Sequence, residues 1–193
     1  MDTLILKGKV TSGLTDEEFF WFCQENRGLR IERNSNLEIH IMSPVTSQGA
    51  NYSGEVFRQL ANWTVLIQTG LAFDSSAGFT LPDRSVLSPD ASWVSREKWN
   101  SLSEDDKNRF SPICPEFIIE VRSKSDSTEE LKKKMAVWLG NGAELAWLID
   151  PIDKRTFVFR PDHPERVIHG FDKEIEGEGK ITGFVLDLSA IST

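Results

Sequence analysis

Asp90 and Glu120 are set apart by their local sequence from ordinary surface carboxylates. Asp90 follows Pro89 at the end of the turn-forming stretch LPDRSVLSPD, and the fixed φ of proline holds the backbone that leads to this short side chain. Glu120 lies inside the apolar run FIIEV, where its charge loses hydration unless a cation or a metal ion compensates. Paired carboxylates can bind a divalent cation and activate water for hydrolysis. A proline–aspartate pair alone, however, is also typical of an ordinary turn.

Alternation along FIIEV predicts which residues accompany Glu120. Ile118, Glu120 and Arg122 share one face of a strand, and the run is apolar enough to predict a central strand that is covered on both faces. One interpretation is a salt bridge between Glu120 and Arg122 at the end of the strand, with no further role. The other is a functional carboxylate, because buried acids with specific partners cluster at active sites.

A lysine could join these carboxylates from the following helix, which we predict over residues 127–140. Its apolar stripe consists of Leu131, Met135, Trp138 and Leu139, with Val137 at the margin. At about 100° per residue, Lys134 falls between Val137 and Trp138, whereas Lys133 points away. The helix therefore directs one ammonium group toward the body of the protein. A lysine stem that extends to solvent is the alternative.

Glu55 is an accessory candidate on a long helix predicted over residues 51–68. The apolar stripe of this helix is formed by Tyr52, Val56, Leu60, Trp63 and Ile67. Glu55 and Gln59 lie at the edge of the stripe, where an acid is either a simple boundary residue or a contributor to a neighbouring site.

The remaining pattern predicts the elements that position these residues. A third helix is predicted over residues 14–26, with Thr15 or Asp16 as its cap, and residues 97–108 read as a short surface helix or loop. Strands are predicted over residues 30–32, 37–42, 71–79, 91–94, 117–121, 145–149, 156–160 and 166–169. This order of elements, αββαββαββ, predicts an α/β or α+β domain with a mixed sheet between helices.

Length and composition restrict the class of protein. A chain of 193 residues, of which 39% are hydrophobic, predicts a single globular domain over 1–193. It contains no apolar run of the roughly 20 residues that a membrane span requires. The start MDTLILKGKVTSG lacks the features of a signal peptide, so we expect a cytoplasmic protein. The net charge of −8 opposes binding to nucleic acid unless the basic groups gather on one surface.

The absence of characteristic cysteine, histidine, serine and glycine motifs disfavours several classes of enzyme. Cys23 and Cys114 are too few and too far apart for a disulfide framework or a zinc site, and are predicted to be buried thiols. The three histidines show no metal-ligand spacing. The chain also has no glycine-rich phosphate loop, no HExxH and no GxSxG, which disfavours zinc hydrolases, nucleotidases and serine hydrolases.

Taken together, Pro89-Asp90 and the strand containing Glu120 resemble the PD-(D/E)XK nuclease superfamily. The stretches LPDRSVLSPDASWVSREKW, CPEFIIEVRSKSDSTEELKKKMAVWLGNGAELAWLIDP and TFVFRP resemble the Uma-type restriction-endonuclease-like proteins, over about Thr15 to Arg160. The resemblance implies a restriction-endonuclease-like mixed β-sheet flanked by helices. It also implies that Asp90 and Glu120 are metal ligands and that Glu55 is similar to the acid of the preceding helix that completes such sites.

The chain departs from the superfamily motif at one position. The motif lysine, two residues after the acid, is replaced by Arg122, and arginine does not readily give up a proton. The resemblance to the Uma-type branch implies that the lysine function moves to Lys134, in agreement with the phase of the helix. Lys124 is the second candidate for this function.

Together with this resemblance, these residues predict a metal-dependent endonuclease that hydrolyses DNA. Hard carboxylates without histidine or thiolate ligands favour Mg²⁺ or Mn²⁺. We expect one metal ion, or two, between Asp90, Glu120 and the Val121 carbonyl, with Glu55 as a further ligand. Lys134 would position or deprotonate the attacking water or pair with the developing charge, and Arg122 and Lys124 would contact substrate phosphate. Symmetric cleavage of both strands would favour a homodimer.

Two other classes of function remain open from the sequence. The acidic balance and Arg122 are compatible with a noncatalytic nuclease-fold module that binds protein or nucleic acid, and metal binding would discriminate against it. A glycosidase could use Asp90 and Glu120 as an acid pair. That reading requires the two carboxylates to lie about 5–10 Å apart with no cationic side chain beside them.

Overall fold

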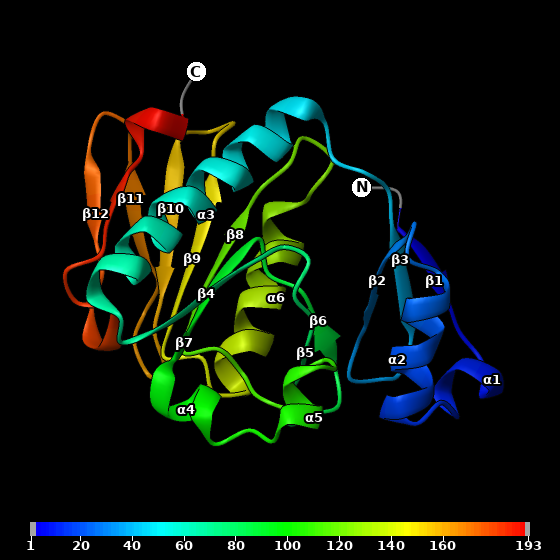
Figure 1. Cartoon of the computed structure of the whole chain (residues 1–193). Coiled ribbons are helices and arrows are strands. Elements are labelled where there is room, and N and C mark those ends of the chain that lie inside the picture. The colour runs from blue at the N-terminus through cyan, green and yellow to red at the C-terminus, as the bar shows by residue number, and fades with distance from the viewer. Residues whose placement is uncertain (1–2, 192–193) are drawn as a thin grey trace.

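The computed structural model describes residues 3–191, so residues 1–2, at the start of the N-terminal segment, and residues 192–193 lie outside the described part. The centre of the molecule is a six-stranded sheet in the order β11-β10-β9-β8-β7-β4 (Figure 1). β8 and β9 are parallel, and the other neighbours in this sheet are antiparallel. Its strands are β4 (Gly70–Asp74), β7 (Ala91–Ser95), β8 (Phe117–Val121), β9 (Leu145–Asp150), β10 (Arg155–Phe159) and β11 (Arg166–His169).

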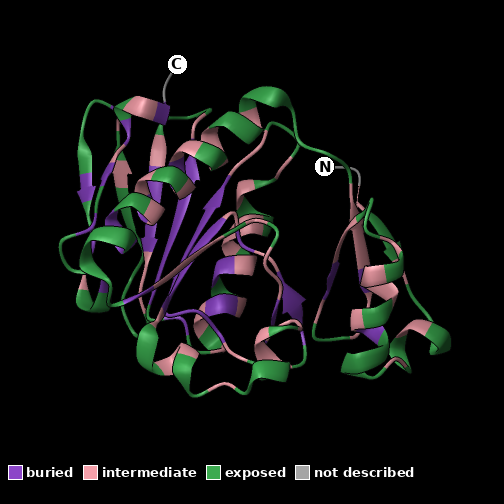
Figure 2. Ribbon diagram, viewed as in Figure 1, coloured by how far each residue is buried: buried purple, intermediate pink, exposed green. Residues whose placement is uncertain are grey.

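Helices α3 (Ser47–Ile67) and α6 (Thr128–Gly140) cover opposite faces of this sheet. The alternation along β8 explains the arrangement, because Phe117 and Ile119 pack in the cluster that contains α3, while Ile118 packs with Met135 and Trp138 of α6. The central strands are buried along their length (Figure 2). The prediction of a central strand covered on both faces is therefore confirmed.

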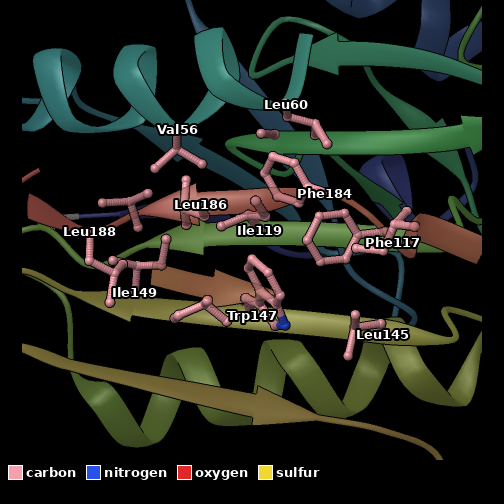
Figure 3. Close-up of a cluster of buried hydrophobic side chains, with 14 of the residues drawn as sticks. Val56, Leu60, Phe117, Ile119, Leu145, Trp147, Ile149, Phe184, Leu186 and Leu188 are labelled. Carbon is pink, nitrogen blue, oxygen red and sulfur yellow. The ribbon is translucent and has the colours of Figure 1, made fainter. Parts of the chain in front are cut away.

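The C-terminal segment completes the core on the α3 side. Strands β12 (Glu174–Glu176) and β13 (Val185–Asp187) pair with each other. The short helix η1 (Gly179–Ile181) lies between them in the chain, and η2 (Ser189–Ile191) follows β13. Phe184, Leu186 and Leu188 lie among the residues of α3, β8 and β9 (Figure 3). The sequence predicted no element here, because strands of three residues are too short to show a periodic pattern.

A second sheet forms the N-terminal side of the molecule, in the order β1-β3-β2-β6-β5. One face packs on α2 through Phe19, Ile39 and Val86. The fully buried Arg33 pairs with Asp16, donates to the carbonyl of Arg84 and lies 4.7 Å from the centre of the Phe19 ring. The strands of this sheet are β1 (Leu4–Leu6), β2 (Arg30–Arg33), β3 (Ile39–Met42), β5 (Phe79–Thr80) and β6 (Val86–Leu87). The helices α1 (Lys9–Ser12) and α2 (Asp16–Glu25) lie between β1 and β2 in the chain.

The predicted helices are present, with one boundary corrected. Thr15 caps α2 through a capping box with Glu18, as the sequence indicated. α3 begins at Ser47 rather than at residue 51, because the Thr46 hydroxyl accepts a hydrogen bond from the Gly49 amide and starts the helix in what was predicted as a loop. Among residues 3–191, no helix combines the length and apolarity needed to cross a bilayer.

Two strand predictions need correction. The strand predicted over residues 71–79 is interrupted, because the Asp74 carboxylate accepts hydrogen bonds from the amide and hydroxyl of Ser76 and turns the chain before β5. The segment read entirely as turn, LPDRSVLSPD, contains β6. The polar segment 97–108 contains two short helices, α4 (Arg96–Asn100) and α5 (Glu104–Lys107). Cys114 is buried as predicted, while Cys23 is only partly buried.

Gly70, the first residue of β4, lies so close to Trp93 and Val94 that any larger residue would clash with them. A Cβ atom at this position would lie 2.3 Å from Trp93 and 2.4 Å from the Val94 carbonyl oxygen. We expect Gly70→Ala to lower the free energy of unfolding by about 2–3 kcal/mol. Gly54→Ala, inside α3 where the new Cβ meets no atom within 4 Å, should raise it by about 0.5–1 kcal/mol. Urea denaturation of both variants checks this pair, and equal effects would contradict it.

Candidate active site

The register of the central sheet brings Asp90 beside Glu120. β7 and β8 pair Ala91 with Ile119 and Ser92 with Ile118, so one further step places Asp90 opposite Glu120. Directly opposed residues in antiparallel strands have Cβ atoms about 4.5–5.5 Å apart. Oδ2 of Asp90 also accepts a hydrogen bond of 2.8 Å from the amide of Val121. The two carboxylates singled out by the sequence therefore belong to one site.

The segment before Asp90 is fixed by β2 of the N-terminal sheet. The Ser88 amide donates to Oε1 of Glu32 at 3.0 Å, and Nη2 of Arg30 donates to the Ser88 carbonyl at 3.2 Å. Both polar groups of the Ser88 backbone are thus held by charged side chains, and Pro89 adds its own restriction of φ. The position of Asp90 depends on the N-terminal sheet as well as on the central one.

Lys134 enters the same site from α6. Its Nζ lies 2.9 Å from Oε1 of Glu120 and 3.1 Å from Oε1 of Glu32, and its side chain is 19% exposed. Nε1 of Trp138, one helical turn later, donates to the same Glu120 oxygen at 3.2 Å. The helical phase predicted from the sequence is correct, because this ammonium group points into the protein.

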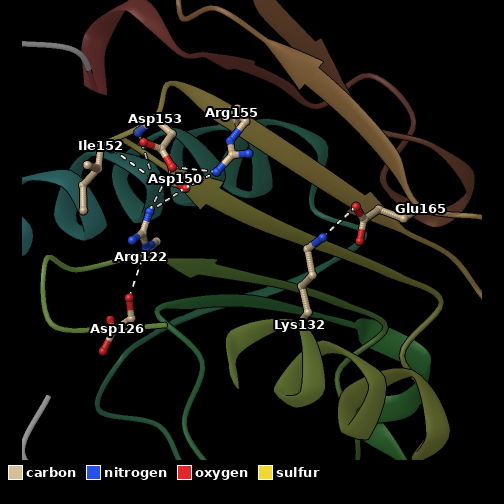
Figure 4. A network of polar contacts seen from close by, with 8 residues as sticks. All are labelled: Arg122, Asp126, Lys132, Asp150, Ile152, Asp153, Arg155 and Glu165. Carbon is tan, nitrogen blue, oxygen red and sulfur yellow. Dashed lines mark hydrogen bonds and ion pairs between the residues drawn. The ribbon is translucent and has the colours of Figure 1, made fainter. Parts of the chain in front are cut away.

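The two neighbouring lysines have other surroundings. Lys132 pairs with Glu165 at 2.9 Å (Figure 4) and lies over the Phe157 ring, 4.4 Å from its centre. Lys133 is exposed, and it reaches the edge of the cavity described below rather than pointing away from it. Lys134 is therefore the lysine of this run that contacts the buried carboxylates.

Burial and neighbouring negative charges raise the pKa of both carboxylates. Burial raises the pKa of Glu120 to about 7; Lys134 opposes this shift, and the negative charges of Asp90 and Glu32 add to it. Burial also raises the pKa of Asp90, against the lowering effects of Arg30 and the Val121 amide. Burial alone would lower the pKa of Lys134, but the Glu120 and Glu32 carboxylates raise it. Lys134 therefore stays protonated at neutral pH.

These groups open into a cavity of about 730 Å³ between the two sheets. The N-terminal sheet supplies one wall through β2 and β3, where Glu32 and His40 are opposed in the register. The start of α3 supplies Gly49 and Ser53. The central sheet and α6 supply the charged floor, with lining residues Asp90, Glu120, Val121, Arg122, Leu131, Lys133, Lys134 and Val137.

Arg30 and Glu32 are site residues that the sequence analysis missed. Both were assigned to a hairpin and given no role. The available signal was their spacing, because residues two apart share one face of a strand, and here that face carries an arginine and a glutamate. Which way the face points depends on tertiary packing, so the sequence alone did not link these residues to Glu120.

The structure does not bring Glu55 into this cavity. Its carboxylate accepts hydrogen bonds from Arg58 at 2.8 Å and Gln59 at 3.1 Å. α3 packs on the face of the sheet opposite to the Glu120 side chain. The expectation that Glu55 completes a metal site is therefore wrong. Lys124 is exposed on the loop between β8 and α6 and is absent from the cavity lining formed by residues 3–191.

The sequence suggested Glu120 or a substrate phosphate as the partner of Arg122, but the structure pairs this residue with two aspartates. Its Nη1 donates to Asp150 at 2.9 Å and to Asp153 at 3.3 Å, and its Nε donates to the Asp126 carbonyl at 3.1 Å (Figure 4). Asp150 is fully buried, and Arg155 also approaches it. The proposed Glu120–Arg122 salt bridge is therefore wrong. A phosphate contact by Arg122 is disfavoured, because its charge offsets two carboxylates.

The donor set fits a divalent cation that keeps part of its water shell. Within residues 3–191, no three His, Cys, Asp or Glu side chains are arranged as a ready metal cage. The hydrogen bonds described above use Oδ2 of Asp90 and Oε1 of Glu120, so the other oxygen of each carboxylate could coordinate an ion. Mg²⁺ is commonly bound by one or two carboxylates together with waters and substrate phosphate.

This mixed sheet between helices is a nuclease-like α/β fold, with acids and a lysine gathered at its central strands. A family model described as "Uma2: Putative restriction endonuclease" matches residues 16–189, and the chain belongs to this family. The structure is similar to one described as "a putative nuclease belonging to DUF820" from Anabaena variabilis. The TM-score is 0.73 at 20% identity, over 93% of this chain and 97% of that chain, which concerns the fold. A comparison with curated proteins finds no match.

These comparisons confirm the resemblance and the fold predicted from the sequence. The matched range includes Asp90, Glu120 and Lys134, so these three site residues lie within the family region. Membership of a family described as "Putative restriction endonuclease" supports the nuclease class for this chain.

Arg122 should contribute mainly to stability. Arg122→Met removes the nearer of the two arginines that pair with the buried Asp150, and leaves Arg155 at 3.5 Å and the amides of Ile152 and Asp153. We expect the free energy of unfolding to fall by about 3 kcal/mol, since a buried charge that loses its nearest cationic partner is costly. Lys124→Met, an exposed cation two residues later, should change it by less than about 0.5 kcal/mol. Urea titration compares the two variants, and a stable Arg122→Met protein would show that Asp150 does not need this partner.

Proposed function

We propose that this protein is a divalent-metal-dependent endonuclease that hydrolyses phosphodiester bonds in DNA. The observation that carries the proposal is the convergence of Asp90, Glu120 and Lys134 from a strand start, a central strand and a helix. Family membership supports the nuclease class. The ammonium group beside Glu120 disfavours a glycosidase, which would need its acid pair without a neighbouring cation.

Asp90 and Glu120, together with the Val121 carbonyl, are the groups that would hold Mg²⁺ or Mn²⁺. Such an ion, when bound, lowers the pKa of a coordinated water and offsets charge on the phosphate oxygens. The chain prepares the site in the absence of any ligand, because Val121 and Ser88 fix the strand start that carries Asp90. Trp138 and Lys134 fix one oxygen of Glu120 and leave the other for coordination.

Lys134 acts in this proposal as a hydrogen-bond donor and a positive charge. Its raised pKa means that it carries no free lone pair at neutral pH, so it is poorly suited to accept a proton from water. A protonated lysine can orient the attacking water or stabilise the negative charge that grows on the phosphate. Of the roles that the sequence left open, the structure favours these two over deprotonation.

The charge distribution is compatible with DNA despite the net charge of −8. The cavity lining includes the cations Arg30, Arg122, Lys133 and Lys134 beside the acids Glu32, Asp90, Glu120, Asp126 and Glu130. A bound divalent ion would therefore be needed to offset the acids before a phosphate could approach. Binding should be modest and should weaken as salt concentration rises. Cleavage of both strands of a duplex would need two such sites, and we propose a homodimer for that reaction.

The proposal predicts which variants lose activity. Asp90→Asn, Glu120→Gln and Lys134→Met should each slow plasmid nicking in Mg²⁺ or Mn²⁺ by about 100-fold or more, because each removes charge that the reacting groups require. Lys132→Met, on the same helix but paired with Glu165, should nick like the wild type. Gel assays of supercoiled plasmid measure these rates. Full activity in Asp90→Asn, or no nicking with either metal, would contradict the proposal.

Metal binding should stabilise the protein in a pH-dependent way. Mn²⁺ at tenfold its Kd adds about 1.4 kcal/mol to the native state, or roughly 3–6 °C in Tm. Because the pKa of Glu120 is about 7, protons compete with the metal, and the shift should shrink from about pH 8 to about pH 5.5.

Thermal unfolding with and without Mn²⁺ measures this shift, with Glu120→Gln as the control that should show none. The result also distinguishes the proposed enzyme from a noncatalytic nuclease-fold module. That alternative is favoured by Arg122, which occupies the position of the motif lysine and pairs with Asp150. An equal shift in wild type and Glu120→Gln would place the metal elsewhere.

A further inference from the structure

Glu32 is a buried carboxylate of the cavity wall to which the proposed mechanism gives no task. It lies on β2 and is 7% exposed, so its charge requires partners within the protein. Its Oε1 accepts from two donors, the Ser88 amide at 3.0 Å and Nζ of Lys134 at 3.1 Å. The second of these donors belongs to a residue that the proposed mechanism places beside the reacting groups.

The Lys134 ammonium group is held by two carboxylates from different sheets. Nζ lies 2.9 Å from Oε1 of Glu120 on β8 and 3.1 Å from Oε1 of Glu32 on β2. A lysine ammonium has three N–H donors in a tetrahedral arrangement, and its four-carbon stem is flexible unless the end is held. Two acceptors on separate strands therefore fix both the position of Nζ and the direction of the third N–H.

The third N–H is the donor that Lys134 can offer to a ligand. Lys134 lines the cavity, and 19% of its side chain is exposed there. A donor stabilises a developing charge most effectively when it already points at the place where that charge appears. With Glu120 as its sole acceptor, the ammonium group could rotate and direct its free donors elsewhere.

Glu32 becomes the more important of the two anchors once a metal ion is bound. In the proposed site Glu120 coordinates the ion, which would draw its charge toward the metal and weaken its attraction for Lys134. Glu32 is not one of the proposed ligands, so its charge stays available to the lysine.

We propose that Glu32 is a positioning residue for Lys134, whose third N–H it aims at the reacting groups together with Glu120. The inference rests on the proposed function and extends it by naming the residue that orients the cation of the site. The alternative is that Glu32 acts only through Ser88, by holding the strand start that carries Asp90. That role leaves the ammonium group unaffected.

The mobility of Lys134 tests this contact in the metal-free protein. ¹³C relaxation of the lysine Cε groups gives an order parameter for the end of each side chain, and the Lys134 signal is identified by its absence in Lys134→Arg. We expect Lys134 to be rigid in the wild type and in Glu32→Gln, which keeps an acceptor oxygen, and its order parameter to fall below about 0.6 in Glu32→Ala.

Arg30→Met removes the other side-chain contact between β2 and Ser88 and is the matched control, in which Lys134 should stay rigid. A mobile Lys134 in the wild type overturns the inference without the need for any variant. Equal order parameters in the wild type and Glu32→Ala also overturn it.

Nicking kinetics in Mn²⁺ give a second readout. Glu32→Ala should lower kcat by about 10- to 100-fold and change KM by less than about threefold, since a misdirected donor slows the chemical step rather than substrate binding. Glu32→Gln should recover most of kcat. In a Lys134→Met background, Glu32→Ala should cost little more, because the group that it positions is gone. Equal losses in both backgrounds, or a Glu32→Gln protein as slow as Glu32→Ala, overturn the inference.

The two proposals can fail separately. A rigid Lys134 that becomes mobile in Glu32→Ala, without any nicking by the wild type, would keep the positioning contact and remove the endonuclease. Nicking by the wild type with an unchanged kcat in Glu32→Ala would keep the endonuclease and remove the positioning role.

Discussion

The burial of Glu120 in the central strand is the constraint that organises the site. A carboxylate that is 4% exposed requires compensation, and Lys134 and Trp138 supply it from one face of α6. This requirement fixes the rotation of the helix against the sheet. Asp90 then adds a second negative charge across the β7–β8 ladder, which keeps both acids short of full compensation. This incomplete compensation supports the proposed binding of a cation.

The N-terminal sheet is part of the site rather than an addition to it. Glu32 connects the two halves, because its Oε1 accepts from Ser88, next to the Pro89-Asp90 motif, and from Lys134 on α6. Arg30 holds the other polar group of Ser88. Arg30 and Glu32 of β2 thereby help to position the Pro89-Asp90 motif, although they lie far from it in the sequence.

The sequence predicted the parts of the site that depend on local periodicity. Alternation along FIIEV indicated the face of Glu120, and the phase of α6 selected Lys134 from three adjacent lysines, because both are properties of one element. The same reasoning failed for Glu55. The sequence placed this residue at the margin of the apolar stripe of α3, but α3 packs on the face of the sheet opposite to the Glu120 side chain. Arg30 was missed because its importance arises from contacts with a segment distant in the chain.

The junction between β2 and β6 consists of a single paired position, Arg33 with Val86. Backbone hydrogen bonding therefore contributes little to holding β2 beside β6 within the N-terminal sheet, and the buried side chain of Arg33, which reaches Asp16 and the Arg84 carbonyl, adds contacts across this junction. Contacts of a buried side chain thus take the place of most of the backbone ladder at this position. Because Arg30 and Glu32 on β2 line the cavity, the placement of this one strand determines the wall that faces Asp90 and Glu120.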